Sequence, residues 1–209
     1  MAEKIEQKHE SMQGFKIFDL YDVSNISIKD DALKPYINLC GKILLKSHGR
    51  NTERFGSAKM NVVEKLARHL DVPGHLGKKH KLITSWASGK YNKNMKTVLE
   101  AFKIIHEKTK TNPVQVLVTA IENGSPRDEV TIIEHAGARY PQAVDCSPYR
   151  RVALALRWFV QGAHNKSFGK KKRISQALAE EIIAASEGSM ESFAVSKKND
   201  LEKQADGAR

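Results

Sequence analysis

Apolar residues in the second half of this chain recur at intervals of three and four positions, the spacing of one buried helix face. In residues 93–109 the pattern includes Val98, Phe102 and Ile105. We therefore expect five or six helices that pack together through apolar faces. Similar apolar stripes occupy residues 60–70, 113–121, 148–163, 174–185 and, more weakly, 189–205.

The boundaries of the helix over residues 113–121 are marked on both sides. Thr111 or Asn112 is suited to cap its first turn, and Pro113 favours the first helical position. Residues 123–126, Asn-Gly-Ser-Pro, provide a left-handed stop and then a proline that prevents continuation. The sequence predicts that this helix ends near Gly124.

A β-hairpin is predicted directly after this helix. Residues 129–134 are rich in β-branched side chains, residues 140–146 could return beside them, and Ala-Gly-Ala at 136–138 supplies a turn. Ser147 and Pro148 then open the next helix. The predicted fold is therefore mainly α: a bundle of five to six helices with a projecting two-stranded β-hairpin arm at about residues 127–147.

The charge of the chain favours a polyanionic partner. Thirty-five Lys and Arg side chains against 24 Asp and Glu give a net charge of +11, which suits nucleic acid first and an anionic membrane second. Residues 1–31 are the exception, with four basic and seven acidic side chains. We expect them to form an acidic N-terminal extension away from the nucleic acid. The weakly alternating segments 15–18 and 23–28 could pair with a neighbour rather than join the core. Residues 32–209 are expected to form one helical nucleic-acid-binding domain that includes the arm.

Compartment and chemistry are constrained by what the sequence lacks. Its two cysteines, Cys40 and Cys146, are too few for a disulfide scaffold or a Cys-based zinc site. There is no N-terminal apolar signal and no run of eighteen apolar residues, so we expect a cytosolic protein that does not span a membrane. His69, His75 and His80 lie close in sequence but lack other ligands, so no metal is expected. No nucleophile motif or phosphate loop is found, and we expect neither catalysis nor a cofactor.

Basic side chains are the candidate functional residues. The arginines of the helix over residues 148–163 have few acidic residues within four positions, and an Arg fork suits phosphate. Basic segments at 46–59, 90–96 and 166–173 are expected to converge on one surface, and Tyr140 near the hairpin tip could stack on a base. The aromatic residues Phe102, Trp158, Phe159 and Phe168 stand at helical spacings and are expected to be mostly core. The candidate RNA-binding residues are Lys46, Arg50, Arg54, Lys59, Lys90, Lys93, Lys96, Arg127, Arg139, Tyr140, Arg150, Arg151, Arg157, Lys166, Lys170, Lys171, Lys172, Arg173, Lys197 and Lys198.

Two other classes of protein remain to be weighed. A helix-turn-helix DNA-binding protein could use the helix containing Arg150 as its recognition helix, but it would need a turn of about three or four residues before that helix. An RNA-modifying enzyme should show a cofactor loop or a pair of carboxylates in a pocket. A Gly-x-x-Gly at residues 74–77 matches the KH-domain loop, but its flanking helices do not fit.

Several motifs in order resemble one known family. The universal small-subunit ribosomal protein called number seven in bacteria and number five in eukaryotes is similar to this chain from about Pro35 onward. Its members usually cross residues 71–88 in fewer positions, which indicates an insertion there. The motifs that carry the resemblance are Pro-Val-Gln-Val-Leu-Val at 113–118, Ser-Pro-Arg at 125–127, Pro-Tyr-Arg-Arg-Val-Ala-Leu-Ala-Leu-Arg-Trp at 148–158, Ala-Leu-Ala-Glu-Glu-Ile at 177–182, Ala-Ala-Ser-Glu-Gly at 184–188 and Lys197-Lys198.

The resemblance implies a structural, non-catalytic protein of cytoplasmic ribosomes. Its expected partners are small-subunit ribosomal RNA in the head of the subunit, the three-prime major domain, and neighbouring ribosomal proteins. The arm is expected to reach toward exit-site transfer RNA and messenger RNA. The family's arm is often more basic than this one, in which Asp128, Glu129 and Glu134 intervene.

Overall fold

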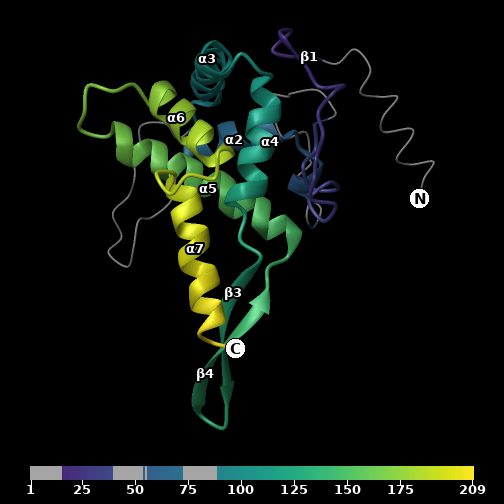
Figure 1. Ribbon diagram of the computed structural model, residues 1–209, viewed down its shortest axis with the longest axis vertical. Helices are drawn as coiled ribbons and strands as arrows, with labels where there is room; N and C mark the ends of the chain where they lie inside the picture. Colours follow the sequence, from purple (N-terminus) through teal and green to yellow (C-terminus); the bar gives the residue numbers. More distant parts are fainter. Residues whose placement is uncertain (1–15, 40–53, 55, 73–88) are drawn as a thin grey trace, which may run out of the picture.

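A computed structural model of the chain describes residues 16–39, 54, 56–72 and 89–209 (Figure 1). Within these residues the predicted mainly α fold with a projecting hairpin is confirmed. Of the expected insertion at 71–88, Asp71 ends a helix and residues 73–88 lie outside the described part. The elements are β1 (Lys16–Ile17), β2 (Tyr21–Asp22), the 3-10 helix η1 (Gly56–Lys59), α2 (Val62–Asp71), α3 (Tyr91–Thr109), α4 (Pro113–Gly124), β3 (Asp128–His135), β4 (Ala138–Asp145), α5 (Pro148–Ser167), α6 (Ile174–Ser186) and α7 (Phe193–Asp206).

The apolar stripes predicted from the sequence form the core. Helix α6 packs against α3, α4 and α5, and α2 packs against α3 and α5. Phe102, Leu156, Phe159 and Leu178 are fully buried between these helices. Phe168 was expected in the core and is 71% exposed instead, because α5 ends at Ser167 and Phe168 lies beyond it.

Local capping explains several helix starts. The Asn112 side chain accepts a hydrogen bond from the Val114 N–H at 3.0 Å, and Pro113 occupies the first helical turn. Asn61 caps α2 in the same way, accepting from Val63 N–H at 2.9 Å. These bonds satisfy backbone donors that a helix start otherwise leaves free.

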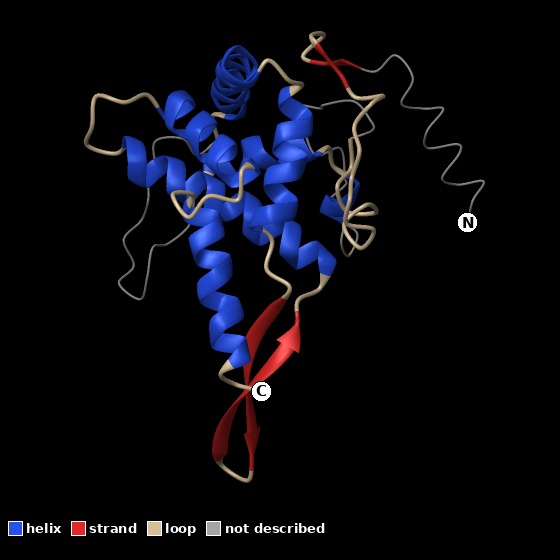
Figure 2. Cartoon of the chain, viewed as in Figure 1, coloured by secondary structure: helices blue, strands red, loops and turns tan. Residues whose placement is uncertain are grey.

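The arm is a regular antiparallel hairpin whose base is attached to α7 (Figure 2). Asp128 pairs with Asp145 at the base, and Ala136 and Gly137 form the turn, both with positive φ (50° and 80°). Positive φ at both central residues is typical of the type I′ hairpin turn. Arg209 contacts Asp128 at 2.6 Å across the base, so the base is fixed while the rest of the arm projects from the helices.

The N-terminal segment joins the core, which corrects the expectation that it would pair only with a neighbour. Ile17 and Val23 are fully buried, and the rings of Phe18 and Tyr21 each lie edge-on to Phe102 with centroids 6.1 Å apart. The alternation in this segment is weak because β1 and β2 are two residues each. Its apolar side chains nevertheless cover a face that the later helices leave open.

Helices α5, α6 and α7 meet at Gly162. A Cβ at this position would lie 2.7 Å from Glu181 Cδ and 2.8 Å from Phe193 Cβ. Glu181 is fully buried, and its Oε1 accepts a hydrogen bond from Ser192 Oγ at 2.8 Å at the start of α7. The Glu181 carboxylate of α6 thus connects α6 to the start of α7, close to the α5 backbone at Gly162.

Candidate nucleic-acid interface

The start of α3 carries three of the predicted basic residues. Lys90, Lys93 and Lys96 are all exposed and make no ion pair with any residue that the structure describes. Lys90 occupies the cap position without a side-chain capping bond. Unpaired N–H groups at a helix start attract phosphate, so this end of α3 combines helix polarity with three ammonium groups.

The two arginines that open α5 have different environments. Arg150 is about half exposed and contacts Glu129 of β3 at 2.7 Å. The Arg151 side chain is only 9% exposed and donates to Asp30 Oδ2 at 2.7 Å and to Ser125 Oγ at 3.3 Å. Acidic partners were expected to be scarce within four positions, but these partners lie 21 and 121 positions away in the sequence. Arg151 is therefore part of the interior and Arg150 part of the surface.

Electrostatics at Asp30 agree with this geometry. Burial acts to raise the pKa of the Asp30 carboxyl, but it is outweighed by the hydrogen bond and positive charge of Arg151 together with the Ala32 N–H and the charge of Arg127. The pKa of Asp30 therefore lies below its ordinary value. The pair ties the N-terminal segment to α5 in its charged form.

The basic segment between α5 and α6 divides into inward and outward side chains. Helix α5 continues through Ser167, beyond the apolar stripe at 148–163 from which it was predicted. Lys166 therefore lies on the helix, and its Nζ contacts Glu181 Oε2 at 2.7 Å. Lys172 pairs with Glu180 of α6. Lys170, Lys171 and Arg173 are the outward group: all three are exposed, and none has an ion pair among the described residues.

The other candidates vary in exposure and pairing. Lys198 Nζ donates to the Asn123 carbonyl at 3.1 Å, joining α7 to the end of α4. Lys197 pairs loosely with Asp200 at 3.5 Å. Arg127 and Arg157 are exposed. Near the end of the arm, Arg139 lies 3.4 Å from Glu134, and Tyr140 is 58% exposed, as expected.

The 46–59 segment is described only in part. Lys46 and Arg50 lie outside the described residues, and so does the side chain of Lys59. Arg54 is exposed. The convergence of this segment with 90–96 and 166–173 on one surface stays a prediction.

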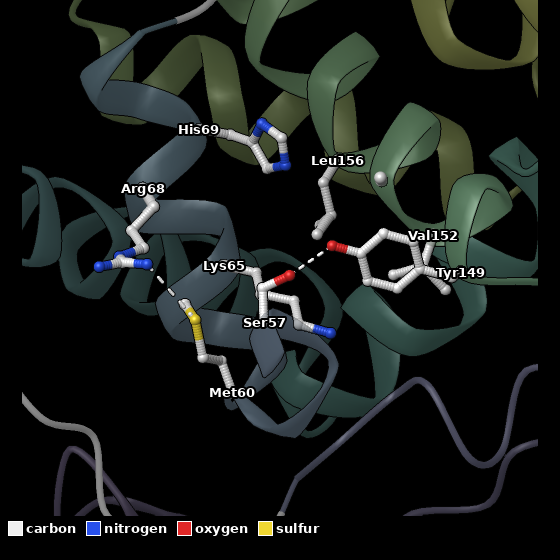
Figure 3. Close-up of a pocket in the computed structure, with 9 residues that line it drawn as sticks. Ser57, Met60, Lys65, Arg68, His69, Tyr149, Val152 and Leu156 are labelled. Carbon is white, nitrogen blue, oxygen red and sulfur yellow. Dashed lines mark hydrogen bonds between the residues drawn. The ribbon is translucent and has the colours of Figure 1, made fainter. Parts of the chain in front are cut away.

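A cleft between α2 and α5 adds basic residues that sequence reasoning missed (Figure 3). It encloses about 270 Å³, with Lys65, Arg68 and His69 on one side and Tyr149 on the other. Burial lowers the pKa of Lys65 to about 8, and burial together with the charges of Arg157 and Lys65 lowers the pKa of His69 to about 4. His69 is therefore neutral at pH 7.

The sequence does contain a sign of this cleft. Positions 65, 68 and 69 are spaced as neighbours on one helix face, beside the apolar stripe formed by Val63, Leu66 and Leu70. Val152 and Leu156 of α5 add apolar side chains to the lining of the cleft. An apolar lining with cationic side chains beside it suits a ligand that has both a planar and an anionic part.

Comparison with known proteins identifies the family. The model of the family described as ribosomal protein S7p/S5e matches residues 42–209. This chain belongs to that family. The matched range includes the helices α2 to α7, the arm and all the candidate residues, whereas the β1–β2 hairpin precedes it.

Similar proteins cover nearly the full length of the chain. A small ribosomal subunit protein uS7 of Nanoarchaeum equitans is 47% identical over 195 residues, which is 93% of this chain and 98% of that protein. The protein of the same name from Thermoplasma volcanium is 41% identical over 194 residues, 92% of this chain and 100% of its own length. The protein of the same name from Methanosphaera stadtmanae is 40% identical over 196 residues, which is 93% of this chain and 99% of that protein.

Family membership decides between the classes of function left open by the sequence. Proteins of the S7p/S5e family are structural, non-enzymatic constituents of the ribosome in the cytoplasm. The helix-turn-helix alternative is wrong, because the strands β3 and β4, and not a short turn, separate α4 from α5.

The remaining alternatives concern metal, membrane and the Gly-x-x-Gly loop. Across the described ranges no group of three His, Cys, Asp or Glu side chains could hold a metal ion. His75, His80 and the Gly-x-x-Gly at 74–77 lie outside those ranges. No helix in the described part of the chain is long and apolar enough to span a membrane.

Proposed function

We propose that this protein binds small-subunit ribosomal RNA in the head of the subunit, the three-prime major domain, through contacts to backbone phosphates. The observation that carries the proposal is the division of its cations into two groups. Arg151, Lys166 and Lys172 are paired within the protein, whereas two clusters present exposed side chains: Lys90, Lys93 and Lys96, and Lys170, Lys171 and Arg173. Cations left exposed beside helix ends are available for RNA phosphates, and specificity then comes from RNA shape.

The arm is proposed to contact exit-site transfer RNA, messenger RNA and neighbouring ribosomal proteins. Its apolar side chains Ile132, Ile133 and Tyr140 are 67%, 44% and 58% exposed. A hairpin is marginally stable by itself in water, and its outer half extends beyond α7 (Figure 1). Exposed apolar side chains on such an arm favour a role in contacting other molecules.

The acidic N-terminal segment is proposed to be excluded from the RNA surface, with residues 32–209 forming the RNA-binding domain. Asp30 neutralises Arg151, and the backbone N–H groups of Lys29 and Asp30 donate to Glu122 Oε1 at 2.6 and 3.1 Å. These contacts direct the segment against α4 and α5. Its own excess of acidic side chains opposes phosphate binding.

Sedimentation with ribosomal subunits tests the RNA-binding proposal. The tagged wild-type protein is expected to sediment with the small subunit in sucrose gradients. A smaller fraction of a variant with Lys90, Lys93 and Lys96 changed to Gln should sediment with the subunit. The control Lys16→Gln, a single change in the acidic segment, should behave as wild type. Wild-type protein that stayed at the top of the gradient would contradict the proposal, as would equal losses in the triple variant and the control.

A further inference from the structure

We propose that Phe168 stacks on an unpaired base of the RNA, while the lysines that follow it hold the adjacent phosphates. The inference rests on the proposed function and names the chemical group that one part of the surface recognises. Phe168 directly follows α5 and is 71% exposed. Among the large apolar side chains of the described residues, none is more exposed.

The backbone holds this ring at the corner of a tight turn. Phe168 has φ −64° and ψ 127°, and Gly169 has φ +70°, values that match the two central residues of a type II β-turn. The Lys170 N–H closes the turn by donating to the Ser167 carbonyl at 3.1 Å, and the Phe168 N–H donates to the His164 carbonyl at 2.8 Å. A ring on a fixed turn loses less conformational freedom on binding than a ring on a loose loop.

One face of the ring is already covered. The His164 imidazole is stacked on Phe168 with centroids 5.0 Å apart and an interplanar angle of 22°. Burial lowers the pKa of His164, so its ring is neutral at pH 7. The two rings form a short stack that is open on the outer face of Phe168, and a nucleic-acid base has the planar shape that extends such a stack.

The charges around the ring favour RNA over a protein. Lys170, Lys171 and Arg173 are exposed and have no ion-pair partner in the described part of the chain. A base in RNA carries phosphates on both sides, which these cations would neutralise. An apolar protein surface placed on Phe168 would instead remove the same cations from water without compensation.

Binding of full-length variants to a transcript of the three-prime major domain of small-subunit ribosomal RNA tests the proposal. Phe168→Ala should weaken binding by about 5- to 150-fold, the range for loss of one base–aromatic stack. The salt dependence should not change, because no charge is lost. Phe168→Tyr should restore binding. Lys171→Gln should instead reduce the slope of log affinity against log salt by about 0.7 to 0.9.

Fluorescence provides an independent readout of the stack. In Phe168→Trp protein, the added indole emission should be quenched when the transcript binds, relative to wild-type protein with its own two tryptophans. The circular dichroism spectrum and the midpoint of urea unfolding should be unchanged in all these variants, since the side chains of Phe168 and Lys171 are both exposed.

Each contrary outcome has a separate meaning. If Phe168→Ala bound the transcript with wild-type affinity, or if the indole emission of Phe168→Trp were not quenched, the base stack would be wrong. The proposal that the protein binds RNA would stand. Unchanged RNA affinity with reduced incorporation into subunits would show that a protein covers the ring, which also overturns the inference. Failure of the wild-type protein both to bind the transcript and to sediment with subunits would overturn the proposed function and the stack together.

Discussion

Arg150 and Arg151 are adjacent in the sequence, but the structure assigns them different roles. The sequence suggested that both are free for phosphate, because it shows acidic neighbours only over short distances. Arg151 is instead enclosed by Asp30 and Ser125, while Arg150 stays at the surface beside Glu129. Contacts between residues so far apart in the chain cannot be obtained from helical spacing, and this is why the pairing of Arg151 could not be predicted from the sequence, whereas the helices could.

Replacing each arginine should separate the two roles. Arg151→Ala should lower the free energy of unfolding by about 1–3 kcal/mol, because Asp30 loses a charged hydrogen-bond partner in a partly buried place. Arg150→Ala should change it by less than about 1 kcal/mol, as for exposed ion pairs. Urea unfolding followed by circular dichroism measures both, and equal effects would contradict the assignment.

The effect of Arg151→Ala should also depend on pH. Because Arg151 holds the pKa of Asp30 below its ordinary value, the pair stabilises the folded protein above a pH of about 4, where Asp30 is ionised in the unfolded chain too. This stabilisation is lost as the pH falls through the lowered pKa. The difference between wild type and variant should therefore be smaller at pH 2–3 than at pH 7 in the same unfolding experiment. A difference that grows in acid would contradict the role of the pair.

Gly162 is constrained by close packing and not by backbone conformation. A methyl group at this position would meet Glu181 Cδ at 2.7 Å and Phe193 Cβ at 2.8 Å. Gly162→Ala should therefore destabilise the protein by about 1–3 kcal/mol, although alanine is the better helix former. Gly207→Ala is a matched control, since its Cβ would have only ordinary contacts at 3.7 Å. Thermal unfolding measures the effect of both variants. Similar unfolding midpoints for Gly162→Ala and Gly207→Ala would contradict the inference that close packing requires glycine at position 162.

At the scale of elements, local chemistry was sufficient to predict most of the fold. Asn112 and Pro113 mark the start of α4, and the apolar stripes of α3, α5 and α6 are buried as expected. These predictions depend on residues that are close in sequence. The failures were at element ends and in weak patterns: α5 runs farther than expected, and Ile17 and Val23 are core residues. The burial of Ile17 and Val23 depends on core residues that are distant in the sequence, and a local pattern contains no information on such contacts.

The register of the arm permits a test of its outer end, the last two residue pairs of the hairpin. Deleting Glu134, His135, Ala138 and Arg139 would join Ile133 and Tyr140 through the existing Ala136-Gly137 turn, because Glu134 pairs with Arg139 and His135 with Ala138. The shortened protein should fold and enter small subunits, since α7 holds only the base. The loss should appear in exit-site transfer RNA retention or in reading-frame accuracy, measured with frameshift reporters in cells that contain only this variant. Failed incorporation would mean that the removed segment belongs to the assembly contacts. Normal decoding would contradict a role of the arm's outer end in contacting transfer RNA or messenger RNA.

At the scale of the whole molecule, the distribution of charge is uneven. Residues 1–31 have three more acidic than basic side chains, although the chain as a whole carries +11. Composition alone was therefore enough to indicate a polyanionic partner for the later part of the chain. It could not show which cations are neutralised internally, as Lys166 is by Glu181.

Binding to the cognate RNA should fall steeply with salt. Each neutralised phosphate contributes a slope of roughly 0.7 to 0.9 in log affinity against log salt concentration. The triple change of Lys90, Lys93 and Lys96 to Gln should reduce the slope by roughly 0.7 to 0.9 for each phosphate that these residues neutralise, whereas Lys16→Gln should leave it unchanged. Filter binding across a salt series gives these slopes. A nearly flat dependence for the wild-type protein would contradict an electrostatic interface.

The attachment of α7 to the base of the hairpin gives the arm the mechanics of a cantilever. Each strand has eight residues, so the free end lies about 27 Å from the clamp if the strands are fully extended. A tilt of about 5° at the Arg209–Asp128 contact would then displace the free end by about 2 Å. A force applied at the free end reaches the helices as a torque, and its bending stress is largest where α7 meets β3.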